Sequence, residues 1–203
     1  NGAALFGAAW APDDTIIFAT AGEGGGLQRV SAAGGTASML ATPDSKLNEA
    51  RYLWPEMMPG GRAMLFTIAT QLGDAGDADA TSQVAVLDLQ TRARKGLLRG
   101  GSHGHYVSGG YLVYAAAGVL RAVAFDSERS EIRGTPVPVL ADVFVTGNGG
   151  ADIGVAEDGT LVYVSGGGMP VQQRTLVWVD RQGRETPIAA PPRAYRYARL
   201  SPD

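Results

Sequence analysis

A short strand-like segment returns four times along the 203-residue chain at a nearly constant interval. Its aromatic fourth residues, Phe18, Phe66, Tyr114 and Tyr163, are separated by 48, 48 and 49 positions. A fixed period of this size is typical of repeat architectures, in which each repeat is one supersecondary unit that packs against its neighbours. The copies are TIIFAT (15–20), AMLFTI (63–68), YLVYAA (111–116) and TLVYVS (160–165).

Each repeat contains four short segments with the composition of β-strands. The first repeat reads AAWAP (8–12), TIIFAT, LQRVSA (27–32) and TASMLAT (36–42), and Gly34-Gly35 suits a two-residue hairpin between the last two. The same plan recurs in QVAVLDLQ (83–90), VLRAVAFD (119–126) and RTLVWVDRQG (174–183), the third segments of the later repeats. The sequence therefore predicts antiparallel four-stranded units and negligible helix.

Four-stranded units in radial repetition are the blades of a β-propeller, so we predict an all-β propeller. The predicted blades cover approximately 7–49, 50–101, 102–147 and 148–192, and 193–203 begins a fifth. The recurring segment is then the same inner strand of successive blades, packed between sheets. Because an open ring would expose apolar faces, we expect a larger ring completed by further sequence, or self-association through open blade edges.

The composition excludes several partners and sites. The net charge is −3 and no basic stripe is present, which argues against nucleic-acid binding. No stretch approaches the ~20 apolar residues of a membrane span, so we expect no membrane insertion within this segment. Cysteine is absent, which excludes disulfides and thiolate metal sites.

The turns APDD (11–14) and AEDG (156–159) and the final run RTLVWVDRQGRETPIAAPPRAYRYARLSPD resemble TolB-like (WD40-like, PD40) β-propeller repeats. The likeness covers essentially the whole chain and is strongest to propeller regions attached to bacterial serine/threonine protein kinases. The resemblance implies a binding or sensing module of a bacterial serine/threonine kinase-associated protein, located outside the cytoplasm, periplasmic or at the cell surface. Relatives also include a periplasmic translocation protein and the propellers of prolyl-oligopeptidase-like peptidases.

Motifs for catalysis are missing from the sequence. It contains no glycine-rich kinase loop with its strand lysine, no HRD-type loop, no DFG and no G-x-S-x-G nucleophile elbow. We therefore expect a non-catalytic module that binds a protein, peptide or small molecule, and no cofactor. The alternatives are a propeller that gates substrate to a hydrolase domain, and a stand-alone propeller enzyme with a metal site.

Two groups of residues are candidate metal ligands. His103 and His105 are two apart, so on a strand both imidazoles face the same side and could share Zn²⁺. Asp74, Asp77 and Asp79 lie in one loop and offer the oxygen ligands that Ca²⁺ prefers. The alternatives are an exposed histidine pair and a solvated loop.

Two further groups are candidate ligand-binding residues. Trp54 lies beside Met57 and Met58, which could form an adaptable binding surface but by burial preference favour the core between blades. The final run alternates arginine and tyrosine, whose stacked side chains could hold a peptide or an anion; its members are Arg193, Tyr195, Tyr197 and Arg199.

Three aspartates end the third segments of their repeats: Asp88, Asp126 and Asp180. Aspartate at such a position commonly bonds to the backbone of the following turn. We interpret these carboxylates as turn formers rather than as catalytic groups.

Overall fold

The computed structural model describes residues 5–20, 25–70, 82–155, 160–166, 177–179 and 184–190. The chain divides into two compact units, Asn1–Gly168 and Met169–Asp203, and each is described by itself. The helical element in the described part is one 3-10 turn, η1 (Ser45–Leu47). None of the described residues belongs to a helix long and apolar enough to cross a membrane.

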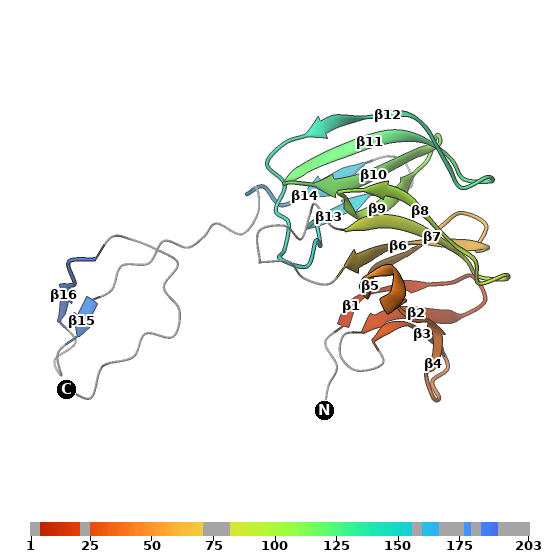
Figure 1. The fold of residues 1–203 in the computed structure, drawn as a ribbon, viewed down its shortest axis with the longest axis horizontal. Coiled ribbons are helices and arrows are strands. Elements are labelled where there is room, and N and C mark those ends of the chain that lie inside the picture. Colours follow the sequence, from red (N-terminus) through yellow and green to blue (C-terminus); the bar gives the residue numbers. More distant parts are fainter. Residues whose placement is uncertain are drawn as a thin grey trace. The chain divides into compact units, whose positions relative to one another are not determined.

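The first unit contains three four-stranded antiparallel sheets, each with its strands side by side in chain order (Figure 1). The first sheet is β1 (Leu5–Trp10), β2 (Thr15–Thr20), β3 (Gly26–Ser31) and β4 (Ser38–Ala41). The second is β5 (Glu49–Met57), β6 (Ala63–Thr70), β7 (Gln83–Asp88) and β8 (Arg94–Arg99). The third is β9 (Ser102–Val107), β10 (Tyr111–Ala116), β11 (Val119–Asp126) and β12 (Glu131–Leu140). The predicted four-stranded units are confirmed for these three repeats.

The fourth repeat is described as two separate strand pairs. In the first unit, β13 (Ile153–Val155) pairs with β14 (Leu161–Tyr163). In the second unit, β15 (Val177–Val179) pairs with β16 (Glu185–Pro187), which matches the third and fourth strands that the repeat predicts. A four-stranded fourth sheet is therefore not observed among the described residues, and 193–203 lies outside them.

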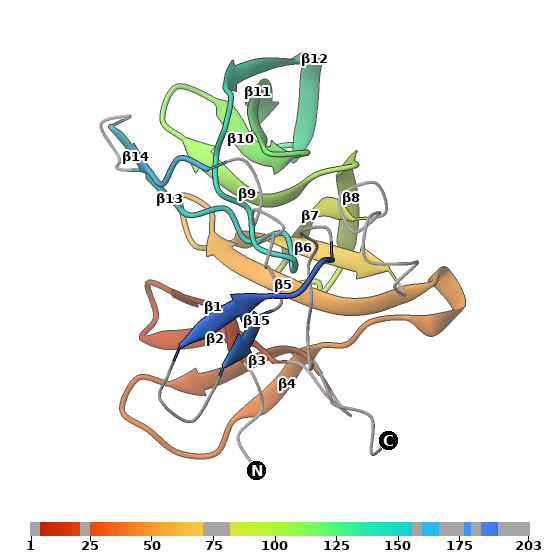
Figure 2. The same cartoon turned by 90° about the vertical axis from the view of Figure 1, so that its left-hand side faces the viewer.

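The three complete sheets are stacked one after another and bury a core at each junction (Figure 2). Strand β6 shows how the sequence achieves this, because Met64, Phe66 and Ile68 pack toward the first sheet while Leu65 packs toward the third. A strand with both faces buried needs a continuous apolar run rather than alternation. This explains why the recurring segment reads AMLFTI.

The recurring aromatic residues differ in burial. Phe66 is 0% exposed and Tyr114 is 4% exposed, as predicted for rings between blades, and Phe18 is half-buried. Tyr163 is 43% exposed, so the prediction that it packs in the core is wrong for this structure. It lies on the three-residue β14, whose one partner among the described strands is β13, so this sheet is only two strands wide.

The turn residues fulfil most of their predicted roles. Gly34 and Gly35 both have positive φ (94° and 113°), but the connection from β3 to β4 is longer than the predicted two residues because β3 ends at Ser31 and β4 begins at Ser38. Asp88 accepts the N–H groups of Gln90 and Thr91, and Asp126 accepts those of Glu128 and Arg129. These turn bonds lower the pKa of both carboxyls, which confirms their role as turn formers. Asp180 lies outside the described residues.

A buried carboxylate joins the first and last strands of the second sheet to the segment that precedes this sheet. Glu49 is 8% exposed and accepts hydrogen bonds from the Tyr52 hydroxyl (2.6 Å) and the Asp44 N–H (2.8 Å), and its Oε2 lies 3.1 Å from Arg94 Nη2. Burial, together with this hydrogen bond to Glu49, raises the pKa of Tyr52. The buried Glu49 carboxylate is therefore stabilised by the Tyr52 hydroxyl, the Asp44 N–H and the Arg94 guanidinium.

Tyr52→Phe is expected to lower the free energy of unfolding by about 1.5–3 kcal/mol, because it removes a hydrogen bond to a buried charged group. Chemical denaturation at pH 7 measures the loss. Tyr111→Phe on the half-exposed Tyr111 is the control and should change little. Equal effects at the two positions would contradict the role of the Glu49 group.

Candidate functional site at the first strands

The first strand of each complete sheet contains a β-bulge at an equivalent place. The pairing register shifts between Leu5 and Ala8 in β1 and between Leu53 and Glu56 in β5. In β9 it shifts between Ser102 and His105. One residue inside each shift has a positive φ: Gly7 (91°), Trp54 (54°) and His103 (48°). The repeat thus places one left-handed residue on the first strand of each of the three complete sheets.

Glycine suits this backbone conformation, but the second and third blades place a tryptophan and a histidine there. A bulky non-glycine residue in a left-handed conformation costs on the order of 1–2 kcal/mol. Bulges bend a strand and re-aim its side chains, and they are frequent next to functional sites. Two adjacent blades therefore tolerate strain to direct a large ring from the same strand position.

These rings form a continuous group with their neighbours. The Trp54 indole contacts the Phe6 ring edge-on, with centroids 6.1 Å apart, and lies 5.1 Å from the His103 ring. The His103 and His105 rings are 4.5 Å apart. We call Phe6, Trp54, His103, His105 and the adjoining Glu56 the first-strand cluster.

The indole of Trp54 is held firmly by backbone on both sides. Its Nε1–H donates to the Asn148 carbonyl at 2.9 Å. A Cβ on Gly150 would lie 2.6 Å from the indole Cζ2, and a Cβ on Gly7 would lie 3.2 Å from the Trp54 Cα. The two glycines therefore permit the close approach that fixes this ring.

His103 is neutral at physiological pH. Its Nδ1 accepts a hydrogen bond from the Ala151 N–H at 2.9 Å, so Nε2 carries the ring proton. Burial, with a contribution from neighbouring His105, lowers the pKa of His103 to about 3. The imidazole is thus a fixed, uncharged hydrogen-bond donor.

His105 and Glu56 form a second polar pair in the cluster. His105 Nδ1 contacts Glu56 Oε2, and Glu56 Oε1 accepts the Tyr106 N–H at 2.8 Å. Since an ionised carboxylate can only accept, Nδ1 carries the proton and donates to it. His105 Nε2 is buried and has no hydrogen-bond partner among the described residues.

The structure brings together two predictions that the sequence analysis made separately. Trp54, a predicted ligand-binding residue, contacts His103, a predicted metal ligand. Within the described ranges no group of three or more histidine or acidic side chains is arranged to hold a metal ion, and His103 Nδ1 is already occupied. Zinc at this pair stays a prediction.

The remaining predicted site residues lie outside the described part of the chain: Asp74, Asp77, Asp79, Arg193, Tyr195, Tyr197 and Arg199. Met58, beside Trp54 in sequence, is buried in the core between the second and third sheets. The sequence analysis missed Phe6 and Glu56. The repeat gave no signal for Phe6, because the first-blade residue at the place of Trp54 and His103 is Gly7.

Comparison with known proteins concerns the fold. No protein-family model matches the sequence, and no curated protein matches it. TolB from Acinetobacter baumannii superposes with a TM-score of 0.52 at 15% identity, over 81% of this chain and 44% of that one. A calcium-binding protein, regucalcin, from Agrobacterium tumefaciens superposes with a TM-score of 0.53 at 13% identity, over 90% of this chain and 57% of that one. The GH43 BlXynB protein from Bacillus licheniformis superposes with a TM-score of 0.51 at 8% identity, over 92% of this chain and 42% of that one.

The fold is a TolB-like β-propeller. At these identities the likeness shows the fold alone, and the chain spans less than two thirds of each of these structures. Propeller blades surround a central channel. Since the first strands contact one another, β1 with β5 and β5 with β9, they form the inner edges of these blades. The first-strand cluster therefore lies on the channel side of the propeller.

Proposed function

We propose that this propeller is a non-catalytic binding module whose first-strand cluster holds a peptide or small-molecule ligand at the channel side. The observation that carries the proposal is the pair of strained bulge residues, Trp54 and His103, which direct adjacent rings from two blades. Strain at equivalent positions of a repeat needs a compensating role, and ligand contact supplies one.

The chemistry of the cluster suits an uncharged or amphipathic ligand. Phe6 and Trp54 offer aromatic surface, and tryptophan is enriched among residues that dominate binding energy. The neutral His103 offers a hydrogen-bond donor at Nε2. A peptide matches this set, because it carries apolar side chains and backbone carbonyl acceptors.

The wider setting of the module is also a proposal. Resemblance of sequence supports a sensor associated with a bacterial serine/threonine kinase and located outside the cytoplasm. A kinase domain and a membrane span encoded before Asn1 in the same reading frame would support this setting. A nucleophile elbow encoded after Asp203 would contradict it and favour a hydrolase-associated propeller.

Selection of a random heptapeptide display library on the immobilised chain tests the binding site. For the selected peptides, Trp54→Ala is expected to weaken binding about 30-fold or more, as loss of a dominant aromatic contact does. Trp10→Ala is the matched control, because Trp10 is 63% exposed and makes no ring contact with the cluster among the described residues. Circular dichroism of both variants verifies folding. Peptides that bind Trp54→Ala as tightly as the parent chain would contradict the proposal.

A further inference from the structure

Two pockets occupy equivalent places at successive blade junctions. The pocket between the first and second blades has a volume of about 320 Å³, and the one between the second and third has about 550 Å³. Ala11 lines the smaller pocket and Met58 the larger. The N–H of Ala11 donates to the Thr15 carbonyl and that of Met58 to the Ala63 carbonyl, which are equivalent bonds across the turn between the first and second strands. Proline follows each, as Pro12 and Pro59. The two pockets are thus repeats of one structural feature.

The pockets differ in the turn residue that lines them. Leu89 lines the smaller pocket from the turn of the second blade and packs against the core of the first junction. Phe125 takes the place of Leu89 in the third blade, because the Leu89 N–H bonds to the Arg62 carbonyl and the Phe125 N–H to the Gly110 carbonyl. Phe125 is buried in the core of the second junction, and the turn residue that lines the larger pocket is Ser127, two residues further on. The apolar part of the larger pocket's lining includes Met58 and Val86.

The turn between the first and second strands of a blade gives a second difference between the junctions. In the smaller pocket, Gly61 of the second blade approaches Pro12 so closely that an added Cβ would lie 2.8 Å from its ring. In the third blade the equivalent residue is Gly109, where the only atom within 4 Å of an added Cβ would be the Tyr111 Cδ2, and no atom of Pro59 comes that near. The second junction is more open because this turn does not close on Pro59.

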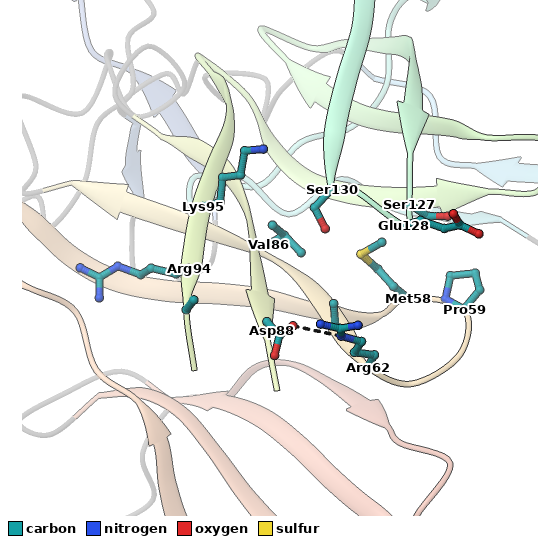
Figure 3. Close-up of a pocket in the computed structure, with 12 residues that line it drawn as sticks. Met58, Pro59, Arg62, Val86, Asp88, Arg94, Lys95, Ser127, Glu128 and Ser130 are labelled. Carbon is teal, nitrogen blue, oxygen red and sulfur yellow. Dashed lines mark hydrogen bonds and ion pairs between the residues drawn. The ribbon is translucent and has the colours of Figure 1, made fainter. Parts of the chain in front are cut away.

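Charged groups of both signs stand at the rim of the larger pocket (Figure 3). The Nε of Arg62 donates to Asp88 Oδ2 at 3.2 Å, while the side chain is 74% exposed and no contact of its Nη atoms is found among the described residues. Glu128 lies on the other wall in an exposed turn. Figure 3 shows Met58 between Arg62 and Glu128, and shows the Arg94 guanidinium directed away from the pocket. The outer edge of the Arg62 guanidinium can therefore take a carboxylate.

We propose that this pocket binds a small zwitterion with an apolar side chain, namely a free apolar α-amino acid. The carboxylate pairs with the Nη edge of Arg62, the ammonium group approaches Glu128, and the side chain covers Met58 and Val86. A volume of about 550 Å³ is within the ~300–1,000 Å³ of small-molecule sites. The site is separate from the first-strand cluster, so it stands or falls independently of the function proposed above.

Isothermal titration of the 203-residue chain with L-leucine and with L-phenylalanine tests this site. Saturable binding is expected for the parent chain. Ser127→Leu adds a larger apolar side chain to the pocket lining and is expected to abolish binding while the melting temperature is kept. Arg62→Gln is expected to raise Kd about tenfold or more, since it removes the charge that pairs with the carboxylate.

Two controls separate the parts of the assignment. L-leucinamide, which lacks the carboxylate, should bind the parent chain at least about tenfold more weakly than L-leucine. Arg29→Gln changes the smaller pocket and should leave the affinity unchanged. Absence of saturable binding of both amino acids, or an unchanged affinity in Ser127→Leu, would overturn the proposal. Equal affinity for L-leucine and L-leucinamide would overturn the role of Arg62.

Discussion

Replacing Tyr114 with alanine is expected to lower the free energy of unfolding by about 3–5 kcal/mol, as large-to-small changes in cores do. The ring is 4% exposed and belongs to the cluster between the second and third blades. It also lies so close to Gly101 that an added Cβ there would be 2.4 Å from the Tyr114 Cδ2. Because the surrounding strands are held by their hydrogen-bond ladders, they cannot collapse to fill the cavity. Denaturant unfolding followed by circular dichroism measures the loss.

Tyr163→Ala is the matched control for this change, because Tyr163 holds the same place in the repeat but is 43% exposed. Its replacement is expected to alter the unfolding free energy by no more than about 0.5–1 kcal/mol. A loss at Tyr163 as large as at Tyr114 would show that the fourth repeat buries this ring in solution. An unchanged stability of Tyr114→Ala would contradict the packing of the second junction.

The period of 48 to 49 residues predicted the fold well, because it reflects the one packing solution that successive blades share. It identified the three complete sheets, and the alternation within LQRVSA and VLRAVAFD located β3 and β11. It failed at Tyr163, since burial depends on what covers a strand and not on the strand itself. The Gly34-Gly35 pair predicted too short a turn, because positive φ alone does not set the loop length.

The candidate site was harder to predict than the fold. Trp54 and the histidines attracted notice as residue types, but their contact arises from bulges in β5 and β9 that carry no clear sequence signal. Tryptophan and histidine are not residues that predict a left-handed backbone. The histidine pair was interpreted as a metal candidate, whereas the structure occupies His103 Nδ1 with the Ala151 N–H. Such a partner comes from a loop 48 residues away, and spacing alone could not reveal it.

His103 is expected to make the protein sensitive to acid. Its pKa is about 3 in the folded chain and near the ordinary 6.5 when unfolded, so the unfolded chain binds more protons between these values. The stability that depends on neutral His103 is therefore complete above pH 6.5 and decreases as the pH falls toward 3. At pH 4 the decrease is on the order of 3 kcal/mol relative to pH 8.

The variant His103→Gln separates this contribution from that of the carboxylates, which also titrate in acid. A glutamine oxygen can accept the Ala151 N–H but does not bind a proton in this range. The unfolding free energy of the parent chain minus that of His103→Gln should therefore decrease steadily from pH 6.5 to pH 4, because only the parent chain loses the contribution of neutral His103. Denaturant unfolding at several pH values measures this difference. Parallel pH dependences would mean that His103 binds its proton as readily in the folded protein as in the unfolded chain, and below pH 6.5 the cluster would then present a cation rather than a neutral donor to its ligand.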